Sequence, residues 1–361
     1  MTGVPSPGWD PDDLLDVRDL SVRFSDGDRS VPALDGLSLV LRQGETVGIV
    51  GESGAGKTVT VRAIMGLLPP VASVSGSVRL WGTELIGLPE RRFRRFRGTE
   101  MGMVFQEASR SLNPTLRVGQ QIAEAVRVHQ SISRRAASER AVELLERVGV
   151  AEAAARARDL PYRLAPLARQ KALVAMAIAC SPKLLIADEA GSSLDRSERA
   201  EMAALLRDLQ HELEMAMILV SHDVGPELSG ADRVLTLCGG QVLERASGET
   251  LKTGPRVPYT RLLLNSSAVL TRRAPPPPPQ APVRPPRMFS RRMPLRLTAP
   301  TRPTRPQVRS ESPLGVGCAF ASRCPSSQLR CREAMPPLKE YEYGHEWACW
   351  FPLNPPATSN A

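Results

Sequence analysis

A glycine-rich segment early in the chain has residue types and a spacing suited to binding phosphates. Residues 51–58 read Gly-Glu-Ser-Gly-Ala-Gly-Lys-Thr, which matches the phosphate-loop pattern G-x-x-x-x-G-K-[ST]. The glycines let backbone N–H groups converge on phosphates, Lys57 adds a positive charge, and Thr58 offers a hydroxyl to Mg²⁺. We therefore expect a nucleoside triphosphate here, contacted by Gly51, Ser53, Gly54, Ala55, Gly56, Lys57 and Thr58.

Three further polar groups follow apolar runs later in the chain. Asp188 and Glu189 end the run that begins at Leu184, and His222 follows the run at 217–221. Asp188 suits a Mg²⁺ ligand, Glu189 can polarise an attacking water, and His222 can bond the γ-phosphate. The alternatives are an acidic helix cap for the carboxylate pair and a structural role for the histidine.

The elements around these groups indicate an α/β unit over about residues 14–265. Short apolar runs that end in polar residues are typical of buried parallel strands, which present side chains at their carboxyl edge. The pattern predicts a strand over 14–24, a helix from near Gly56 to about Leu68, a helix over 141–150 and a hairpin around Gly239–Gly240.

The charge of the chain is concentrated in one segment. The formal net charge is +9, and ten Arg with no Asp or Glu fall within residues 272–310. Elsewhere 37 Lys and Arg nearly balance 38 Asp and Glu, whereas a nucleic-acid binder should carry a basic face on its folded part. We therefore expect no nucleic-acid partner, and the Arg-rich segment is interpreted as a soluble spacer or, alternatively, as a contact to anionic lipid.

No run approaches the length of a membrane span, and the polar N-terminus has no signal-peptide core, so the expected location is the cytosol. Beyond the α/β unit, a Pro/Arg-rich linker is expected over 266–312 and a small Cys-rich module over 313–352. In a cytosolic protein this cysteine cluster favours a metal over disulfides, and its spacing alone permits zinc. The cysteines are Cys318, Cys324, Cys331 and Cys349.

The order of motifs resembles that of the nucleotide-binding subunits of ABC transporters over about residues 14–265. The phosphate loop is followed by Val104-Phe105-Gln106, Asp188-Glu189, Ser193-Leu194-Asp195 and Ser221-His222-Asp223. The resemblance implies a P-loop NTPase fold with a helical subdomain at about 105–180, and ATP hydrolysis with Mg²⁺. It also assigns Gln106 to Mg²⁺ and transmembrane-partner sensing, Ser193–Asp195 to the D-loop, His222 to the H-loop, and Phe24 to adenine stacking, with a core role for Phe24 as the alternative.

A narrower resemblance is to the oligopeptide, dipeptide and nickel importer branch, carried by Ser-Leu-Asn-Pro at 111–114 and by the four C-terminal cysteines. It implies a [4Fe–4S] cluster on those cysteines, with zinc or no metal as alternatives. It also implies two transmembrane permease subunits, an extracytoplasmic substrate-binding protein, and a place on the cytoplasmic face of the bacterial inner membrane. Nickel or another small solute, and a non-transport ABC ATPase, remain alternatives to peptide import.

One segment departs from the family pattern. Where such subunits carry Leu-Ser-Gly-Gly-Gln, this chain has Leu164 followed by Ala165, Pro166, Leu167 and Ala168. The changes remove a hydroxyl and a backbone N–H and add bulk, so this segment should bind ATP poorly. Because family members pair head to tail, we expect an asymmetric heterodimer with a second ATPase subunit whose signature is intact. A non-functional chain, or a regulatory half with little turnover, is the alternative.

Overall fold

The computed structural model describes residues 10, 12–26, 29–106, 111–222, 225, 228, 230–271 and 316–354. Most of the expected Pro/Arg-rich linker, residues 272–312, lies outside these ranges. Its first part does not: helix α10 (Pro258–Thr271) continues past the boundary expected at residue 265. Within the described residues, no helix has both the length and the apolar character needed to cross a bilayer.

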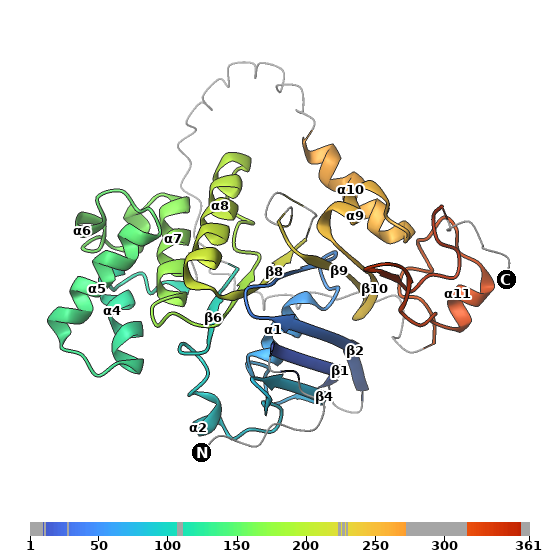
Figure 1. The fold of residues 1–361 in the computed structure, drawn as a ribbon, viewed down its shortest axis with the longest axis horizontal. Helices are drawn as coiled ribbons and strands as arrows, with labels where there is room; N and C mark the ends of the chain where they lie inside the picture. The colour runs from blue at the N-terminus through green and yellow to red at the C-terminus, as the bar shows by residue number, and fades with distance from the viewer. Residues whose placement is uncertain are drawn as a thin grey trace, which may run out of the picture.

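An eight-stranded sheet forms the centre of the molecule (Figure 1). Its strands are β3 (Thr46–Val50), β6 (Met101–Val104), β7 (Leu184–Asp188), β8 (Ala216–Ser221), β9 (Arg233–Cys238), β10 (Gln241–Ala246), β11 (Lys339–Glu342) and β12 (His345–Trp347). The order is β11-β12-β10-β9-β3-β8-β7-β6, and the strands from β9 to β6 are parallel. Every residue of β3, β7 and β8 is buried, which explains their continuous apolar sequences.

The predicted hairpin is present where β9 turns into β10. The two strands pair antiparallel, with Cys238 opposite Gln241, and the turn consists of Gly239 and Gly240. Both glycines have positive φ, +50° and +81°, which is the conformation that a tight two-residue hairpin requires.

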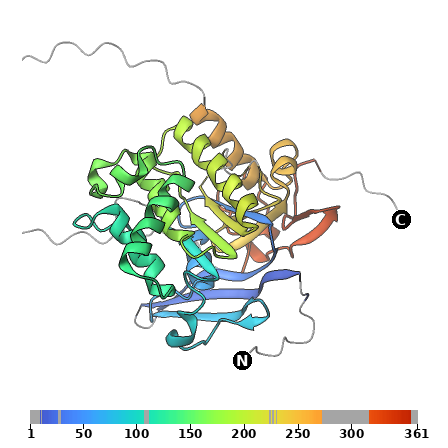
Figure 2. The same cartoon turned by 60° about the vertical axis from the view of Figure 1, so that its left-hand side comes forward.

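A second sheet of four antiparallel strands, in the order β2-β1-β4-β5, packs beside the central one. Its strands are β1 (Asp13–Asp26), β2 (Arg29–Arg42), β4 (Ala72–Leu80) and β5 (Thr83–Glu84). The predicted strand at 14–24 lies within β1, and its residues Leu15, Val17, Leu20 and Val22 belong to the core, with a register shift between Val17 and Leu20 that interrupts the alternation. In Figure 2 this sheet (blue) and the helices near α8 and α10 (yellow-green and orange) lie on opposite sides of the central sheet.

The helix after the phosphate loop is shorter than predicted. Helix α1 (Lys57–Ile64) ends before Leu68. Gly66 adopts φ +61°, a left-handed conformation that terminates helices, and Pro69 and Pro70 follow after two leucines. The helical spacing of apolar residues continues to Leu68, but the backbone conformation of Gly66 ends the helix earlier.

Among the described residues between β6 and β7, four α-helices form a subdomain, seen on the left of Figure 1. They are α4 (Val118–His129), α5 (Arg134–Arg147), α6 (Ala153–Arg156) and α7 (Pro166–Ala177). The predicted helix at 141–150 is the second half of α5, which ends shortly before Gly149. The remaining helical segments are α2 (Glu90–Phe93), the 3₁₀ turn η1 (Pro161–Arg163), α8 (Arg196–Leu213), α9 (Gly248–Thr253) and α11 (Leu329–Glu333).

The C-terminal segment, residues 316–354, is joined to the central sheet. Strand β12 pairs antiparallel with β10, with Trp347 opposite Glu244, so the segment extends the sheet at one edge. Phe320 and Trp347 are 2% and 1% exposed and belong to the same hydrophobic cluster as the helical subdomain. A segment of this length buries little core by itself, and here it shares the core of the larger unit.

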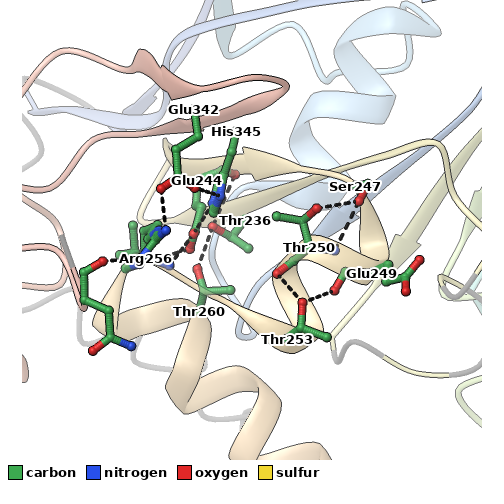
Figure 3. A network of polar contacts seen from close by, with 12 residues as sticks. Thr236, Glu244, Ser247, Glu249, Thr250, Thr253, Arg256, Thr260, Glu342 and His345 are labelled. Carbon is green, nitrogen blue, oxygen red and sulfur yellow. Dashed lines mark hydrogen bonds and ion pairs between the residues drawn. The ribbon is translucent and has the colours of Figure 1, made fainter. Parts of the chain in front are cut away.

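A buried polar network fixes this junction (Figure 3). The carboxylate of Glu244, which is fully buried, lies 2.7 Å from His345 Nε2 and accepts the backbone N–H groups of Arg256 and Val257. Arg256 also pairs with Glu342. These contacts satisfy a carboxylate that would otherwise be costly to bury, and they tie the β11–β12 hairpin to β10 and to the start of α10.

Candidate functional site

The phosphate loop connects β3 to α1 through two positions that require glycine. A Cβ on Gly51 would lie 2.2 Å from the Leu237 carbonyl oxygen, and one on Gly56 would lie 2.8 Å from the Ala33 carbonyl oxygen. Gly56 also has φ +105°. The loop can therefore approach β9, β2 and a ligand with bare backbone, and the N-terminus of α1 favours an anion at its mouth.

Lys57 is held inside the loop. Its side chain is 4% exposed, and Nζ donates to the carbonyl oxygens of Gly51 at 2.8 Å and Glu52 at 3.1 Å. Nζ also lies 3.5 Å from Oε1 of Glu189. A buried ammonium group needs such partners, so the lysine is kept in place beside the phosphate site.

A hydroxyl and a carboxylate predicted to bind Mg²⁺ are in contact. Thr58 donates from Oγ1 to Oδ1 of Asp188 over 3.3 Å. Burial raises the pKa of Asp188 above its usual value, the negative charge of Glu189 adds to this rise, and the bond from Thr58 opposes it. Buried oxygen ligands with crowded negative charge suit a hard divalent cation, so this pair fits Mg²⁺.

Glu189 follows β7 in a left-handed conformation, with φ +50°. A non-glycine residue there is uncommon and is found at functional sites. Its backbone N–H donates to the Val220 carbonyl of β8, and its Oε2 accepts Nε2 of Gln106 at 2.7 Å. Gln106 follows β6, the parallel neighbour of β7, so adjacent strand ends deliver the two side chains together.

The predicted groups meet at one open cleft of about 590 Å³. It is lined by residues 52–59 of the phosphate loop and by Gln106, Glu189 and His222. His222 directly follows β8, which lies between β3 and β7. Side chains at the ends of four parallel strands thus surround a space able to hold a triphosphate, and one residue of its wall, Thr58, contacts Asp188.

Some lining residues were missed by sequence reasoning. Ala33 of β2 and Ser192, next to the expected D-loop, contribute to the wall. Leu262, Leu263 and Ser266 of α10 also line the cleft. This helix follows the last recognisable motif, so apart from its apolar run nothing in the sequence linked it to the phosphate loop.

Phe24 lies apart from the residues that line the cleft. It sits on β1 opposite Val31 and Ala72, partly buried against the core cluster of the antiparallel sheet. Its expected stacking on adenine stays a prediction.

The altered signature segment forms the exposed start of α7. Ala165 precedes the helix and Pro166 is its first residue; both are exposed, while Leu167 and Ala168 are partly buried against the core. Proline is favoured at this position because its missing N–H would be unpaired in any helix. The change is therefore compatible with the fold, but it removes an N–H donor and a serine hydroxyl from the helix tip.

The four C-terminal cysteines line one small cavity of about 20 Å³. Phe320, Pro336, Trp350 and Phe351 supply apolar walls. Burial raises the pKa of Cys318 and Cys324, and that of Cys349 to about 11. Among the described residues, no three His, Cys, Asp or Glu side chains are grouped so as to hold a metal ion. The donor set fits a metal centre in its chemistry, although the side chains are not gathered around a single ion.

Comparisons with known proteins agree with this geometry. The sequence profile of the family described as "ABC transporter" matches residues 34–192. The chain is 40% identical to the probable peptide ABC transporter ATP-binding protein y4tR of Sinorhizobium fredii, over 93% of this chain and 94% of that protein. It is 36% identical to the oligopeptide transport ATP-binding protein OppD of Escherichia coli, over 97% and 96% of the two chains.

The fold is also found among solved structures. One match is the dimeric ATP-binding cassette MJ0796, solved in a post-hydrolysis state with ADP and Pi. It superposes with a TM-score of 0.59 at 24% identity, and the match covers 65% of this chain and 98% of the MJ0796 chain. That likeness supports the fold. The relatives of similar length support membership of a family. With these relatives, and with a phosphate loop, the Thr58–Asp188 pair and Glu189 at neighbouring strand ends, this chain belongs to the family of ABC transporter ATP-binding proteins.

Proposed function

We propose that this chain hydrolyses ATP to power an importer of oligopeptides or dipeptides. The observation that carries the proposal is that Lys57, Thr58, Gln106 and Glu189 line one cleft, with Asp188 in contact with Thr58. The relatives named for peptide transport, at 36–40% identity over nearly the whole chain, support peptides as the cargo.

The proposed assembly has two permease subunits, an extracytoplasmic substrate-binding protein and a second ATPase subunit. The chain would lie on the cytoplasmic face of the bacterial inner membrane, reached through the permeases. Gln106 lies where a signal from the permeases can enter, since it contacts Glu189 directly. A change in the position of Gln106 would therefore shift the carboxylate of Glu189, which polarises the attacking water.

Hydrolysis in this proposal depends mainly on positioning and charge. Lys57 and the loop N–H groups hold the β- and γ-phosphates, and Glu189 orients the attacking water and accepts its proton. Mg²⁺, when bound by Thr58 and Asp188, neutralises phosphate charge. His222 at the end of β8 is suited to bond the γ-phosphate from the opposite wall.

Lys57→Ala tests the import function. Inner-membrane vesicles with the assembled transporter, loaded with ATP, should take up labelled oligopeptide through the binding protein, and the variant should lose at least about 100-fold in rate because the phosphate charge is unpaired. Lys252→Ala, on exposed α9, is the matched control and should transport normally. Uptake of nickel chelates or other small solutes, with none of peptides, would contradict the proposed cargo.

We also propose that the working assembly is an asymmetric heterodimer. In a head-to-tail pair each nucleotide lies between one subunit's phosphate loop and the helix tip of the other. This chain would offer an intact phosphate loop but a tip with Pro166 and no serine hydroxyl. A partner with an intact signature would complete one good site, whereas two copies of this chain would make two poor ones.

Repairing the altered segment tests this asymmetry. The triple change Ala165→Ser, Pro166→Gly, Leu167→Gly should let the chain hydrolyse ATP as a homodimer, at least about tenfold faster than the unchanged chain, because one restored donor is worth that much. Ala168→Ser, within the same segment, serves as the control. Ordinary ATPase rates in homodimers of the unchanged chain would refute the heterodimer.

We infer that Cys318, Cys324, Cys331 and Cys349 hold a [4Fe–4S] cluster. Support comes from their shared cavity and apolar walls. The pattern of the four cysteines resembles that of the oligopeptide, dipeptide and nickel importer branch, and this resemblance favours the cluster over zinc.

Metal analysis of the full chain purified without oxygen tests the cluster. We expect about four iron and four sulfide per chain and a broad visible absorbance. Cys331→Ser should lose both, whereas Cys180→Ser, outside the cavity, should keep them. One zinc per chain, or no metal, would overturn the inference.

A further inference from the structure

The phosphate loop is held from behind by a tyrosine of α10. The backbone N–H of Glu52 donates to the hydroxyl oxygen of Tyr259 over 2.9 Å, and that hydroxyl donates to the Leu237 carbonyl over 3.1 Å. Tyr259 is fully buried. The second residue of the loop is thus tied to the end of β9 through one hydroxyl group, and its N–H points away from the phosphate cleft.

Arg323 of the C-terminal segment binds the side chain of Glu52. Arg323 donates to both carboxylate oxygens of Glu52, with N–O distances of 3.0 and 2.6 Å. Paired bonds of this kind fix orientation as well as distance. Arg323 directly precedes Cys324, so a residue next to a cavity cysteine bonds a residue that lines the nucleotide cleft.

The tyrosine and the arginine support one another through Phe320. The ring centroids of Tyr259 and Phe320 are 5.2 Å apart, and the Arg323 guanidinium lies 5.3 Å from the centre of the Phe320 ring. Phe320 is itself buried in the main core. The brace on Glu52 is therefore one packed unit built from α10 and residues 318–324.

This unit rests on a fixed base. Strand β12 continues the central sheet from β10, and the network around Glu244 and His345 clamps the hairpin to the start of α10 (Figure 3). Arg245 adds a bond to Glu346 at 3.1 Å. Strands β10 and β12 belong to the same sheet as β3, which leads into the phosphate loop. Arg323 and Tyr259 are therefore held at a fixed position relative to Glu52.

The third anchor of Glu52 is the catalytic lysine. The carbonyl oxygen of Glu52 accepts a hydrogen bond from Nζ of Lys57 at 3.1 Å. The backbone N–H of Glu52 donates to Tyr259, and its carboxylate accepts from Arg323. These contacts fix the orientation of the Glu52 peptide group. In that orientation its carbonyl oxygen faces Nζ of Lys57.

We propose that Tyr259 and Arg323 are positioning residues that hold the phosphate loop in its nucleotide-binding shape. Neither touches the reacting atoms; both act through Glu52. Without them the loop spends a smaller fraction of time in the competent conformation, and the apparent nucleotide affinity falls by that fraction. The C-terminal segment thereby becomes part of the nucleotide site.

Kinetics of the assembled complex separate this role from a general structural one. Arg323→Met should raise KM for ATP up to about fivefold, as for a half-exposed ion pair. Tyr259→Phe, which strands a buried N–H and carbonyl, should raise it on the order of tenfold. In both variants kcat should change little, because substrate and transition state lose binding equally.

The control is Arg330→Met, which removes an arginine of the same segment that stacks on Trp350 and not on the loop. In a Glu52→Gln background, Arg323→Met should add almost no further effect, since the pair is already broken. Calorimetric affinity of the full chain for MgADP should follow the same order, and it depends on neither cargo nor partner subunit.

Unchanged KM and unchanged ADP affinity in both variants would overturn the proposal. So would a fall in melting temperature with kcat and KM altered no differently from Arg330→Met. Either result would leave the proposed import function intact, because that function rests on the cleft residues themselves.

Discussion

The buried positive charge of Lys57 is the constraint around which the nucleotide site is arranged. An ammonium group that is 4% exposed is costly unless it is paired, and here two loop carbonyls and Glu189 share it. Two of those partners come from the loop itself, which curls back on Lys57. The third comes from the end of β7, which is separated from β3 by β8 alone, so that Glu189 lies within 3.5 Å of the lysine.

The altered signature segment lies outside this arrangement. The cleft and the start of α7 lie on different parts of the molecule, and α7 is well formed with proline at its first position. The altered helix tip is compatible with a well-formed α7, and Lys57, Asp188 and Glu189 keep their contacts. In the proposed head-to-tail pair, the altered tip would face the nucleotide of the neighbouring subunit, so we propose an asymmetric assembly.

Sequence reasoning predicted the parts whose signals are local. The phosphate loop, the strands ending at Asp188 and Ser221, and the glycine hairpin each follow from a few consecutive residues. It missed the end of α1, which is set by the φ of Gly66.

It also missed the union of the C-terminal segment with the sheet, because that depends on pairing between residues 244 and 347 in strands too short for periodicity. The contacts of Arg323 and Tyr259 with Glu52 are equally non-local.

The most direct test of the account is the ATPase rate of the complete complex, isolated from native membranes, with and without Glu189→Gln in this chain. Replacing the carboxylate with an amide keeps the bond to Gln106 possible but removes the base, so we expect the rate to fall at least about 100-fold. Glu139→Gln, on exposed α5, is the matched control. An unchanged rate would mean that the partner hydrolyses ATP despite the altered tip of α7, and that this chain's cleft is not the working site.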